Sequence, residues 1–254
     1  IHDKPLIFYS LTTMILAGVR DLIVICREQD KLLYECLLKD GSEFGIQIRY
    51  RVQREPEGIP QALLLASNDL DENERVFLGL GDNLIYGPGS GRHFSYQNLD
   101  DKAKIFCFSV SNPTEFGVAE LDRSGSILSL EEKPLIPRSN LAITGFYSLP
   151  SDSFEIAKTL RKSVRGEYEI IDLLKIYLDM NRLDYGIFPR GTSWLDAGTT
   201  EGMTSSAEFV RLVQNRQGIL VCSPHEAAWQ VGNIDSSELA NIAQEYGKSK
   251  YGEM

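Results

Sequence analysis

The sequence has no long apolar segment, few histidines and no paired cysteines. None of its hydrophobic runs approaches the roughly 20 residues that span a bilayer, and no signal peptide opens the chain, which begins at Ile1. The four cysteines lack CxxC or metal-ligand spacing, and the three histidines are scattered. We therefore expect no membrane span and no His-based metal site, and we interpret the cysteines as reduced core thiols of a cytoplasmic protein.

Basic side chains are in the minority. The 26 Lys and Arg residues are outnumbered by 36 Asp and Glu residues, which gives a net charge of −10. This balance argues against a nucleic-acid footprint and against binding to an anionic membrane surface. A phosphate-rich small ligand stays possible, because it needs only a local basic pocket. The 254 residues are enough for one large α/β domain or two small ones.

What the sequence does contain is an alternation of helix and strand patterns. In the first half, apolar runs typical of strands at 22–26, 46–52 and 76–81 are separated by helical patterns. In the second half, strand-like runs with short turns at 104–110, 117–121, 126–130 and 142–149 are followed mainly by helices. This order predicts a doubly wound, mostly parallel mixed α/β sheet of Rossmann-like architecture, with added antiparallel strands and C-terminal helices. Since no linker stands out, we expect a single domain over 1–254, with 223–254 as a helical appendage for packing or association.

The run from Val76 to Gly81 is the most informative stretch. It is apolar or glycine throughout, follows a charged segment and ends abruptly at Asp82-Asn83. Such a run predicts a strand buried on both faces of a parallel sheet. Its carboxyl end is where open α/β sheets bind ligands, and a carboxylate there is an expected seat for a divalent cation that holds phosphates. The alternative is that Asp82 only caps a turn.

Four other short segments each have a structural and a functional interpretation. Residues 131–134 put a carboxylate beside an ammonium, or form a solvated turn. Residues 193–199 end an apolar stretch at Asp196, or form a helix entry capped by Thr199 or Thr200. Residues 116–118 are consistent with a tight strand start, and residues 165–170 with a helix opening that carries acids in its first turn. Taken singly, each segment is better explained by structure than by function.

The combination and order of these motifs resemble the sugar-1-phosphate nucleotidyltransferases, and most closely the branch that uses dTTP and glucose 1-phosphate. The resemblance extends over nearly the whole chain. The matching motifs are Asp3-Lys-Pro5, Leu16-Ala-Gly-Val-Arg-Asp21, Leu80-Gly-Asp-Asn83, Phe116-Gly-Val118, Leu130-Glu-Glu-Lys-Pro134, Ser139-Asn140, Thr144-Gly-Phe-Tyr147, Arg165-Gly-Glu167, Glu169-Ile170 and Trp194-Leu-Asp-Ala-Gly-Thr199.

The resemblance implies a role for each matched position. It makes Asp82 and Asp196 the ligands of Mg²⁺, and with Lys133, which meets the sugar phosphate, the catalytic residues. It makes Glu132 the acid that holds sugar hydroxyls. The remaining substrate-binding positions are Gly117, Ile143 and Thr144 around the sugar and Gln53 and Gly58 at the pyrimidine base.

The resemblance also implies the reaction and its setting. The sugar 1-phosphate would attack the α-phosphorus of dTTP, so that pyrophosphate leaves and dTDP-glucose forms for deoxysugar and surface polysaccharide synthesis. The expected enzyme is a cytoplasmic homo-oligomer, a tetramer by resemblance. Smaller departures are Pro60 beside the base site, Ile171 in place of a threonine and Ala197 in the Trp-Leu-Asp motif. Pro60 leaves the choice between dTTP and UTP open.

One family feature is not in the sequence. The family begins with a strand and a Gly-rich G-x-G-T-R-L loop, a unit of roughly 30 residues, which cradles the triphosphate through backbone N–H groups and an arginine. We interpret the chain as truncated at its N-terminus, and we expect it to be inactive without that unit. The alternative is a non-catalytic short form that binds sugar nucleotides or regulates another protein.

Overall fold

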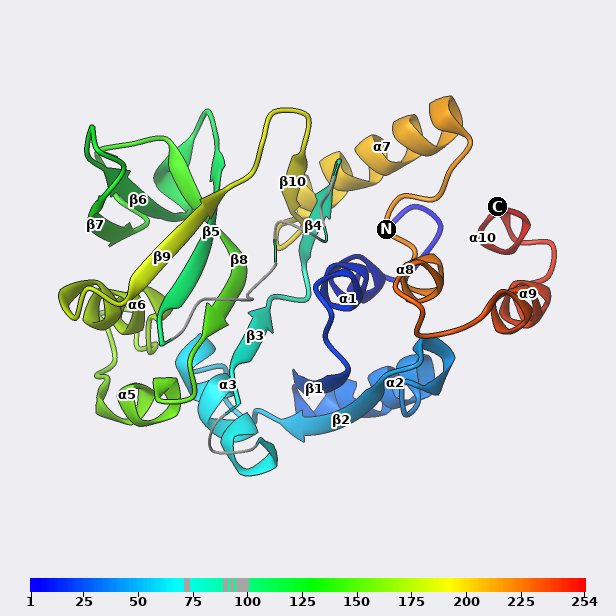
Figure 1. The fold of residues 1–254 in the computed structure, drawn as a ribbon, viewed down its shortest axis with the longest axis horizontal. Helices are drawn as coiled ribbons and strands as arrows, with labels where there is room; N and C mark the ends of the chain where they lie inside the picture. The colour runs from blue at the N-terminus through cyan, green and yellow to red at the C-terminus, as the bar shows by residue number, and fades with distance from the viewer. Residues whose placement is uncertain (71–73, 89–90, 92–93, 95–100) are drawn as a thin grey trace.

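The computed structural model describes residues 1–70, 74–88, 91, 94 and 101–254. Its helices and strands alternate in an α/β order (Figure 1). The α-helices are α1 (Ile7–Leu16), α2 (Glu28–Leu38), α3 (Ile59–Ala66), α5 (Ser153–Thr159), α6 (Ile170–Asp179), α7 (Thr200–Gln217), α8 (Pro224–Gln230), α9 (Ser236–Glu245) and α10 (Lys250–Glu253). The strands are β1 (Asp21–Cys26), β2 (Gln47–Val52), β3 (Val76–Gly79), β4 (Asn83–Tyr86), β5 (Ala103–Ser109), β6 (Gly117–Leu121), β7 (Ile127–Glu132), β8 (Leu141–Leu149), β9 (Leu183–Ile187) and β10 (Ser193–Asp196). Three short 3₁₀ helices, η1 (Ser42–Phe44), η2 (Ser67–Asp69) and η3 (Pro113–Glu115), join them.

The strands of the described residues form one large sheet and two small ones. The large sheet has the order β7-β6-β8-β5-β9, with β3 also paired to β8. The small sheets are the parallel pair β1-β2 and the antiparallel pair β10-β4. The predicted α/β class with a mixed sheet is confirmed. Antiparallel pairs are more numerous than predicted, however, because within the large sheet only β5 and β9 run parallel.

Strand β3 differs from its prediction. It pairs antiparallel with β8, from Val76 opposite Leu149 to Gly79 opposite Phe146, and its residues are only half-buried. The prediction of a strand buried on both faces of a parallel sheet is therefore wrong for the described residues. An apolar run predicts that its side chains are buried, but it does not predict whether the neighbouring strand runs parallel or antiparallel.

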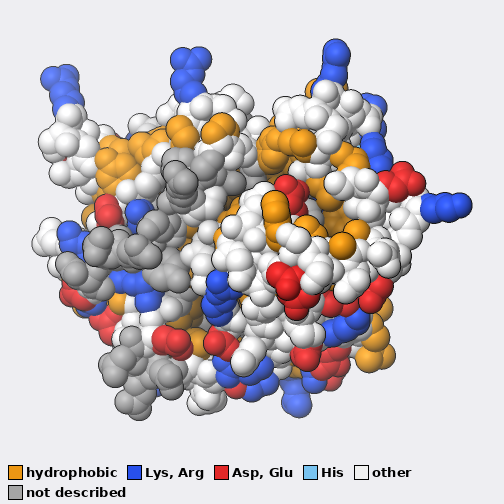
Figure 2. Space-filling view, turned by 45° about the vertical axis from the view of Figure 1, so that its right-hand side comes forward, with side chains coloured by type: hydrophobic (Ala, Val, Ile, Leu, Met, Phe, Trp, Pro, Cys, Tyr) orange, Lys and Arg blue, Asp and Glu red, His pale blue; other side chains and the backbone are white. Residues whose placement is uncertain are grey.

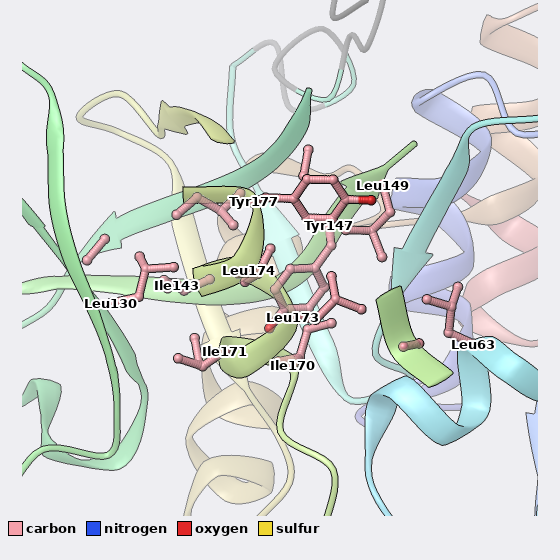
Figure 3. Packing of buried hydrophobic residues seen from close by; sticks show 14 of the residues in the cluster. Leu63, Leu130, Ile143, Tyr147, Leu149, Ile170, Ile171, Leu173, Leu174 and Tyr177 are labelled. Carbon is pink, nitrogen blue, oxygen red and sulfur yellow. The ribbon is translucent and has the colours of Figure 1, made fainter. Parts of the chain in front are cut away.

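Helices α3, α5 and α6 cover one face of the large sheet and form its main core. The core side chains of α6, which are Ile170, Ile171, Leu173, Leu174 and Tyr177, lie against Ile143 and Tyr147 of β8 (Figure 3). Helix α6 carries these residues at helical spacing, so burying this face is what docks the helix. The packing fixes the start of α6 at the carboxyl end of β7, where the candidate site lies.

The last segment, 223–254, contains helices α8, α9 and α10. Its helices pack on α1 and η1, and both chain ends lie on this side of the molecule (Figure 1). At its centre His225 is buried, with its ring 4.7 Å from that of Phe44 and 5.9 Å from that of Phe8. We call this packing of α1, η1 and α8–α10 the His225 core. The single-domain interpretation stays a prediction.

The surface agrees with the acidic composition. On the face in Figure 2, lysine and arginine side chains project singly along the upper edge and lie among acidic ones in the lower part, without forming one large basic patch. Among the described residues, no helix combines the length and the apolar character that a membrane crossing requires. All four cysteines are free thiols; Cys26, Cys107 and Cys222 are buried and Cys36 is exposed.

Candidate active site

The two aspartates predicted to bind metal lie side by side. Strand β10 pairs antiparallel with β4, which places Asp196 opposite Asn83, and the backbone N–H of Ala197 donates to the carbonyl of Asp82 (2.9 Å). A Cβ atom added at Gly198 would lie 2.9 Å from Asp82 Oδ2 and 3.0 Å from Asp196 Oδ1. The two carboxylates therefore face one small space that only glycine leaves open.

The electrostatics of this pair reflect its crowding. Burial raises the pKa of Asp196, the N–H of Gly198 partly opposes the shift, and the nearby Asp82 carboxylate adds to it. Two partly desolvated carboxylates that face one space repel each other. A cation between them would relieve that repulsion.

The side chain of Asn83 fixes the orientation of Asp82. Its Oδ1 accepts from the indole N–H of Trp194 (2.7 Å) and the backbone N–H of Gly145 (3.2 Å). Its Nδ2 therefore points at Asp82 Oδ1 (2.9 Å), which leaves Oδ2 of that carboxylate free to face Gly198. Asn83 thus ties β4, β8 and β10 together at the acid pair.

A cleft of about 220 Å³ runs from the acid pair toward α6. The residues that line it include six of the predicted site positions, which are Gly58, Gly117, Glu132, Lys133, Ile143 and Asp196. A larger hollow of about 330 Å³ lies at the β2–α3 connection and is lined by Val52, Arg54, Glu55, Glu57, Gln61 and Leu65. It contains neither of the paired aspartates, so the smaller cleft is the candidate active site.

Glu132 and Arg165 form a polar group in the cleft. Arg165 Nη1 lies 3.4 Å from Glu132 Oε1 and 3.7 Å from Glu169 Oε1. Burial, followed by the Glu169 carboxylate, raises the pKa of Glu132, while Lys133 and Arg165 oppose the shift. Glu132 is therefore a desolvated hydrogen-bonding group, suited to hold the hydroxyls of a bound ligand.

Lys133 is held in an uncommon backbone conformation. It follows β7 with φ of 43°, a left-handed value that side-chain-bearing residues rarely adopt, and its N–H donates to the carbonyl of Phe116 (3.0 Å). Within the described part of the chain, no carboxylate lies at ion-pair distance from its ammonium group. The cleft thus contains a cation available to an anionic ligand.

Two glycines give the cleft its shape. A Cβ atom at Gly117 would lie 2.8 Å from Ile171 Cδ1 and 3.4 Å from Glu132 Oε2. At Gly58, φ is +104° and a Cβ atom would lie 2.2 Å from the carbonyl oxygen of Tyr168. Both positions need the smallest side chain because neighbouring chain segments approach closely.

Thr144 and Gln53 are placed differently from the other predicted residues. Thr144 is fully buried and donates its hydroxyl to the carbonyl of Phe106 (2.9 Å), so its side chain is turned away from the cleft that its neighbours Ile143 and Gly145 line. Gln53 directly follows β2 and contacts the carbonyl of Gly58 (3.3 Å), at the margin of the cleft.

Sequence reasoning gave no role to three residues that organise the site. Asn83 and Trp194 lie within recognised motifs, yet nothing in the sequence shows that their side chains bond each other. Gln61 belongs to no recognised motif, and its side chain contacts that of Gln53 (2.6 Å). Position in the sequence is the only signal, since Gln61 lies in the first turn of α3, the helix that follows Gln53.

The arrangement can hold an anionic ligand and a divalent cation. The described residues contain no cluster of three or more His, Cys, Asp or Glu side chains that could hold a metal ion. The paired oxygens of Asp82 and Asp196 nevertheless fit a hard cation that takes its other ligands from phosphate oxygens and water.

Comparison with known proteins agrees with this geometry. The family model described as "Nucleotidyl transferase" matches residues 1–211. The chain is 43% identical over 252 residues to the glucose-1-phosphate thymidylyltransferase of Mycolicibacterium smegmatis, covering 99% of this chain and 87% of that protein. It is 39% identical over 254 residues to the enzyme of the same name from Neisseria meningitidis, covering 100% of this chain and 88% of that protein.

Solved structures show the same fold. A Bacillus anthracis protein, described as a glucose-1-phosphate thymidylyltransferase and crystallised with sucrose, is 31% identical with a TM-score of 0.76, and the match covers 83% of this chain and 84% of that one. A UDP-glucose pyrophosphorylase in complex with UDP-glucose is 23% identical with a TM-score of 0.71, covering 83% of this chain and 88% of that one, and supports the fold alone. The chain therefore belongs to the nucleotidyl transferase family of enzymes.

Proposed function

We propose that this protein transfers the nucleotidyl group of dTTP to glucose 1-phosphate and forms dTDP-glucose. The observation that carries the proposal is that Asp196, Lys133 and the desolvated Glu132 line one cleft, and that Asp82 faces Asp196 across the space at Gly198. The relatives that match almost the whole chain are named for this reaction.

The chemistry follows from these groups. A phosphate oxygen of glucose 1-phosphate forms a bond to the α-phosphorus of dTTP, the α–β phosphoanhydride bond breaks, and pyrophosphate leaves with the bonding electrons. Lys133 offsets the repulsion between the two anions as they approach and aligns them. Glu132 accepts hydrogen bonds from sugar hydroxyls, and Gly117 lets Ile171 and Glu132 approach the backbone of β6 closely beside the sugar.

Asp82 and Asp196 are the residues that would hold Mg²⁺. The ion would neutralise phosphate charge and stabilise the charge that develops on the leaving group. Gln53 and Gly58 would border the base, and the backbone of Ile143 and Thr144 the sugar. We also propose that the protein is a homo-oligomer, expected to be a tetramer, and that it is located in the cytoplasm. Its product would be used in deoxysugar and surface polysaccharide synthesis.

Pyrophosphate release tests the reaction. The purified protein is incubated with glucose 1-phosphate, Mg²⁺ and each of dTTP, UTP, ATP and GTP, and kcat/KM is compared. The assay is run on the 254 residues and on the same chain preceded by the family's Gly-rich segment, because that segment carries the triphosphate cradle. We expect dTTP to be used and purines to be rejected, since a larger ring would have to displace the loop at Gln53. Equal kcat/KM values for ATP and dTTP would refute the proposal.

A further inference from the structure

A chain of side-chain hydrogen bonds leads away from the proposed base site. Gln53 Nε2 donates to Gln61 Oε1 (2.6 Å) and to the carbonyl of Gly58 (3.3 Å). Gln61 Nε2 in turn donates to Glu57 Oε2 (2.8 Å), and Lys162 donates to the other oxygen of the same carboxylate. These hydrogen bonds therefore connect Lys162 to Gln53 through Glu57 and Gln61.

Glu57 and Lys162 determine which groups donate and which accept along this series of hydrogen bonds. An ionised carboxylate can only accept a hydrogen bond and an ammonium can only donate one, so Glu57 must receive the Nε2 of Gln61. The backbone N–H of Glu57 also donates to Gln61 Oε1 (3.3 Å), which holds the same orientation. An amide is assigned by its partners, and here every partner of the Gln61 amide agrees.

The orientation of Gln53 follows from that of Gln61. Both groups that contact Gln53 Nε2 are acceptors, so the nitrogen is committed to the protein. No donor among the described residues contacts Gln53 Oε1. This oxygen is also not among the buried side-chain atoms that lack a hydrogen-bond partner, so it is accessible to a ligand. Gln53 thus keeps one acceptor oxygen that no described donor occupies, beside Gly58, which lines the cleft.

We infer that Glu57 and Gln61 are positioning residues that select the base, because they fix Gln53 with its oxygen toward the nucleotide. The inference rests on the proposed function, in which Gln53 borders the base. Thymine and uracil carry an N–H at ring position 3 and can donate to this oxygen, whereas cytosine carries a bare nitrogen there and can only accept. The site thus takes dTTP or UTP and rejects CTP.

Replacing Glu57 by glutamine tests the inference. Lys162 can only donate, so it should keep the oxygen of the substituted amide and leave the new –NH₂ facing Gln61. That arrangement favours reversal of Gln61 and then of Gln53, which would present an N–H to the base. We expect the ratio of kcat/KM for dTTP to that for CTP to fall at least about tenfold in Glu57→Gln, as the loss or mismatch of one buried hydrogen bond predicts.

The matched control is Glu55→Gln, which removes the same charge from the same loop. Glu55 makes no side-chain contact in the chain of hydrogen bonds described above, and we expect this variant to keep the wild-type dTTP/CTP ratio. A loss of stability or of general activity lowers both kcat/KM values together, so it leaves the ratio unchanged. Only a change at the base moves the ratio.

The possible results separate the inference from the proposed function. A lower ratio in Glu57→Gln with an unchanged ratio in Glu55→Gln supports the positioning role. If the wild-type protein prefers dTTP and Glu57→Gln keeps that preference, the positioning role alone is overturned. If the wild-type protein does not distinguish pyrimidines from purines, both the positioning role and the proposed function are overturned. If Glu57→Gln fails to fold, Gln61→Met is tested in its place. Methionine has a similar length but cannot orient Gln53 by a hydrogen bond. An unchanged dTTP/CTP ratio of kcat/KM in Gln61→Met also overturns the inference.

Discussion

The candidate cleft and the region around the His225 core differ in how their charged side chains are paired. In the cleft, Asp82 and Asp196 face each other and no carboxylate pairs with Lys133 among the described residues. In the His225 core, the hydroxyl of Tyr251 contacts both Ser223 (2.8 Å) and His225 Nδ1 (2.8 Å). Next to this core, Lys4 lies over the Tyr251 ring (5.6 Å) and is paired with Asp3 (2.7 Å). Charged side chains that the protein leaves unpaired in a cleft are available to a ligand, while buried charged pairs contribute to folding. The comparison predicts that substitutions in the cleft change kinetics and those in the core change stability.

The largest effect is expected at the acid pair. Asp82→Asn or Asp196→Asn should lower kcat by roughly 10²–10³-fold, because a neutral amide is a weak partner for the cation that stabilises the developing charge. The melting temperature should not fall, since each change removes one of two repelling charges. Steady-state pyrophosphate release and thermal melts measure both quantities. Near wild-type turnover in both variants at saturating Mg²⁺ would contradict the assignment.

Asp3→Asn should show the reverse pattern. The side chains of Lys4 and Asp3 are only 1% and 7% exposed, and burial already lowers the pKa of Lys4. Removing the carboxylate leaves a buried ammonium without its counter-charge, which costs about 3 kcal/mol of unfolding free energy. Chemical denaturation measures this loss, and kcat/KM of the folded fraction should stay unchanged. A fully stable Asp3→Asn variant would show that the pair is not needed for folding.

The pH dependence of stability sharpens the comparison further. Burial lowers the pKa of His225 to about 4, and its Nε2 has no hydrogen-bond partner among the described residues. The unfolded chain therefore binds a proton near pH 6.5, before the folded protein does. Stability should fall as the pH drops from about 6.5 to 4, by about 3 kcal/mol in total, and this histidine should add no further loss below about pH 4.

The variant His225→Phe isolates this contribution. Phenylalanine can pack beside Phe8 and Phe44 and does not titrate, so the difference in pH dependence between the two proteins belongs to His225. Denaturant melts at several pH values between about 7 and 4 provide the measurement. Parallel stability curves for wild type and variant would mean that His225 does not titrate in this way.

The smallest effect is expected at Glu132. Replacing it by glutamine keeps the size of the side chain but weakens the hydrogen bonds that it accepts from sugar hydroxyls. We expect KM for glucose 1-phosphate to rise about tenfold, with KM for dTTP nearly constant. Because burial raises the pKa of Glu132, removing its charge should not lower the melting temperature. An equal rise in both KM values would argue that Glu132 acts on the shape of the cleft rather than on the sugar.

Much of the fold could be predicted from local patterns. Strands β6 and β8 and helices α6 and α7 occur where periodicity and turn residues place them, and Thr199 caps α7 by accepting from the N–H of Gly202. The direction of β3 and the existence of β4 could not be predicted. Strand β4 is short, and its partner β10 is far away in the sequence, so no local pattern distinguishes it from a loop.

The candidate site was predictable to the level of motifs. Asp82, Lys133 and Asp196 could be proposed as site residues because each lies at or just after the end of an expected strand and matches a family motif. The links among Lys162, Glu57, Gln61 and Gln53 could not be named, because the orientation of an amide depends on partners that only the folded chain brings into contact. Thr144 shows the opposite case, since the alternation of β8 turns its side chain away from the cleft.

The pairing of β4 with β10 also bears on how the site is assembled. Asn83 and Trp194, which bond each other beside the two aspartates, are 111 positions apart in the sequence. During synthesis, Asp82 leaves the ribosome long before the strand that carries its companion, and contacts of such separation form late because closing a long loop is slow. Any N-terminal fragment that ends before β10 lacks the acid pair altogether, so a nascent chain cannot form the proposed cation site until that strand has been made.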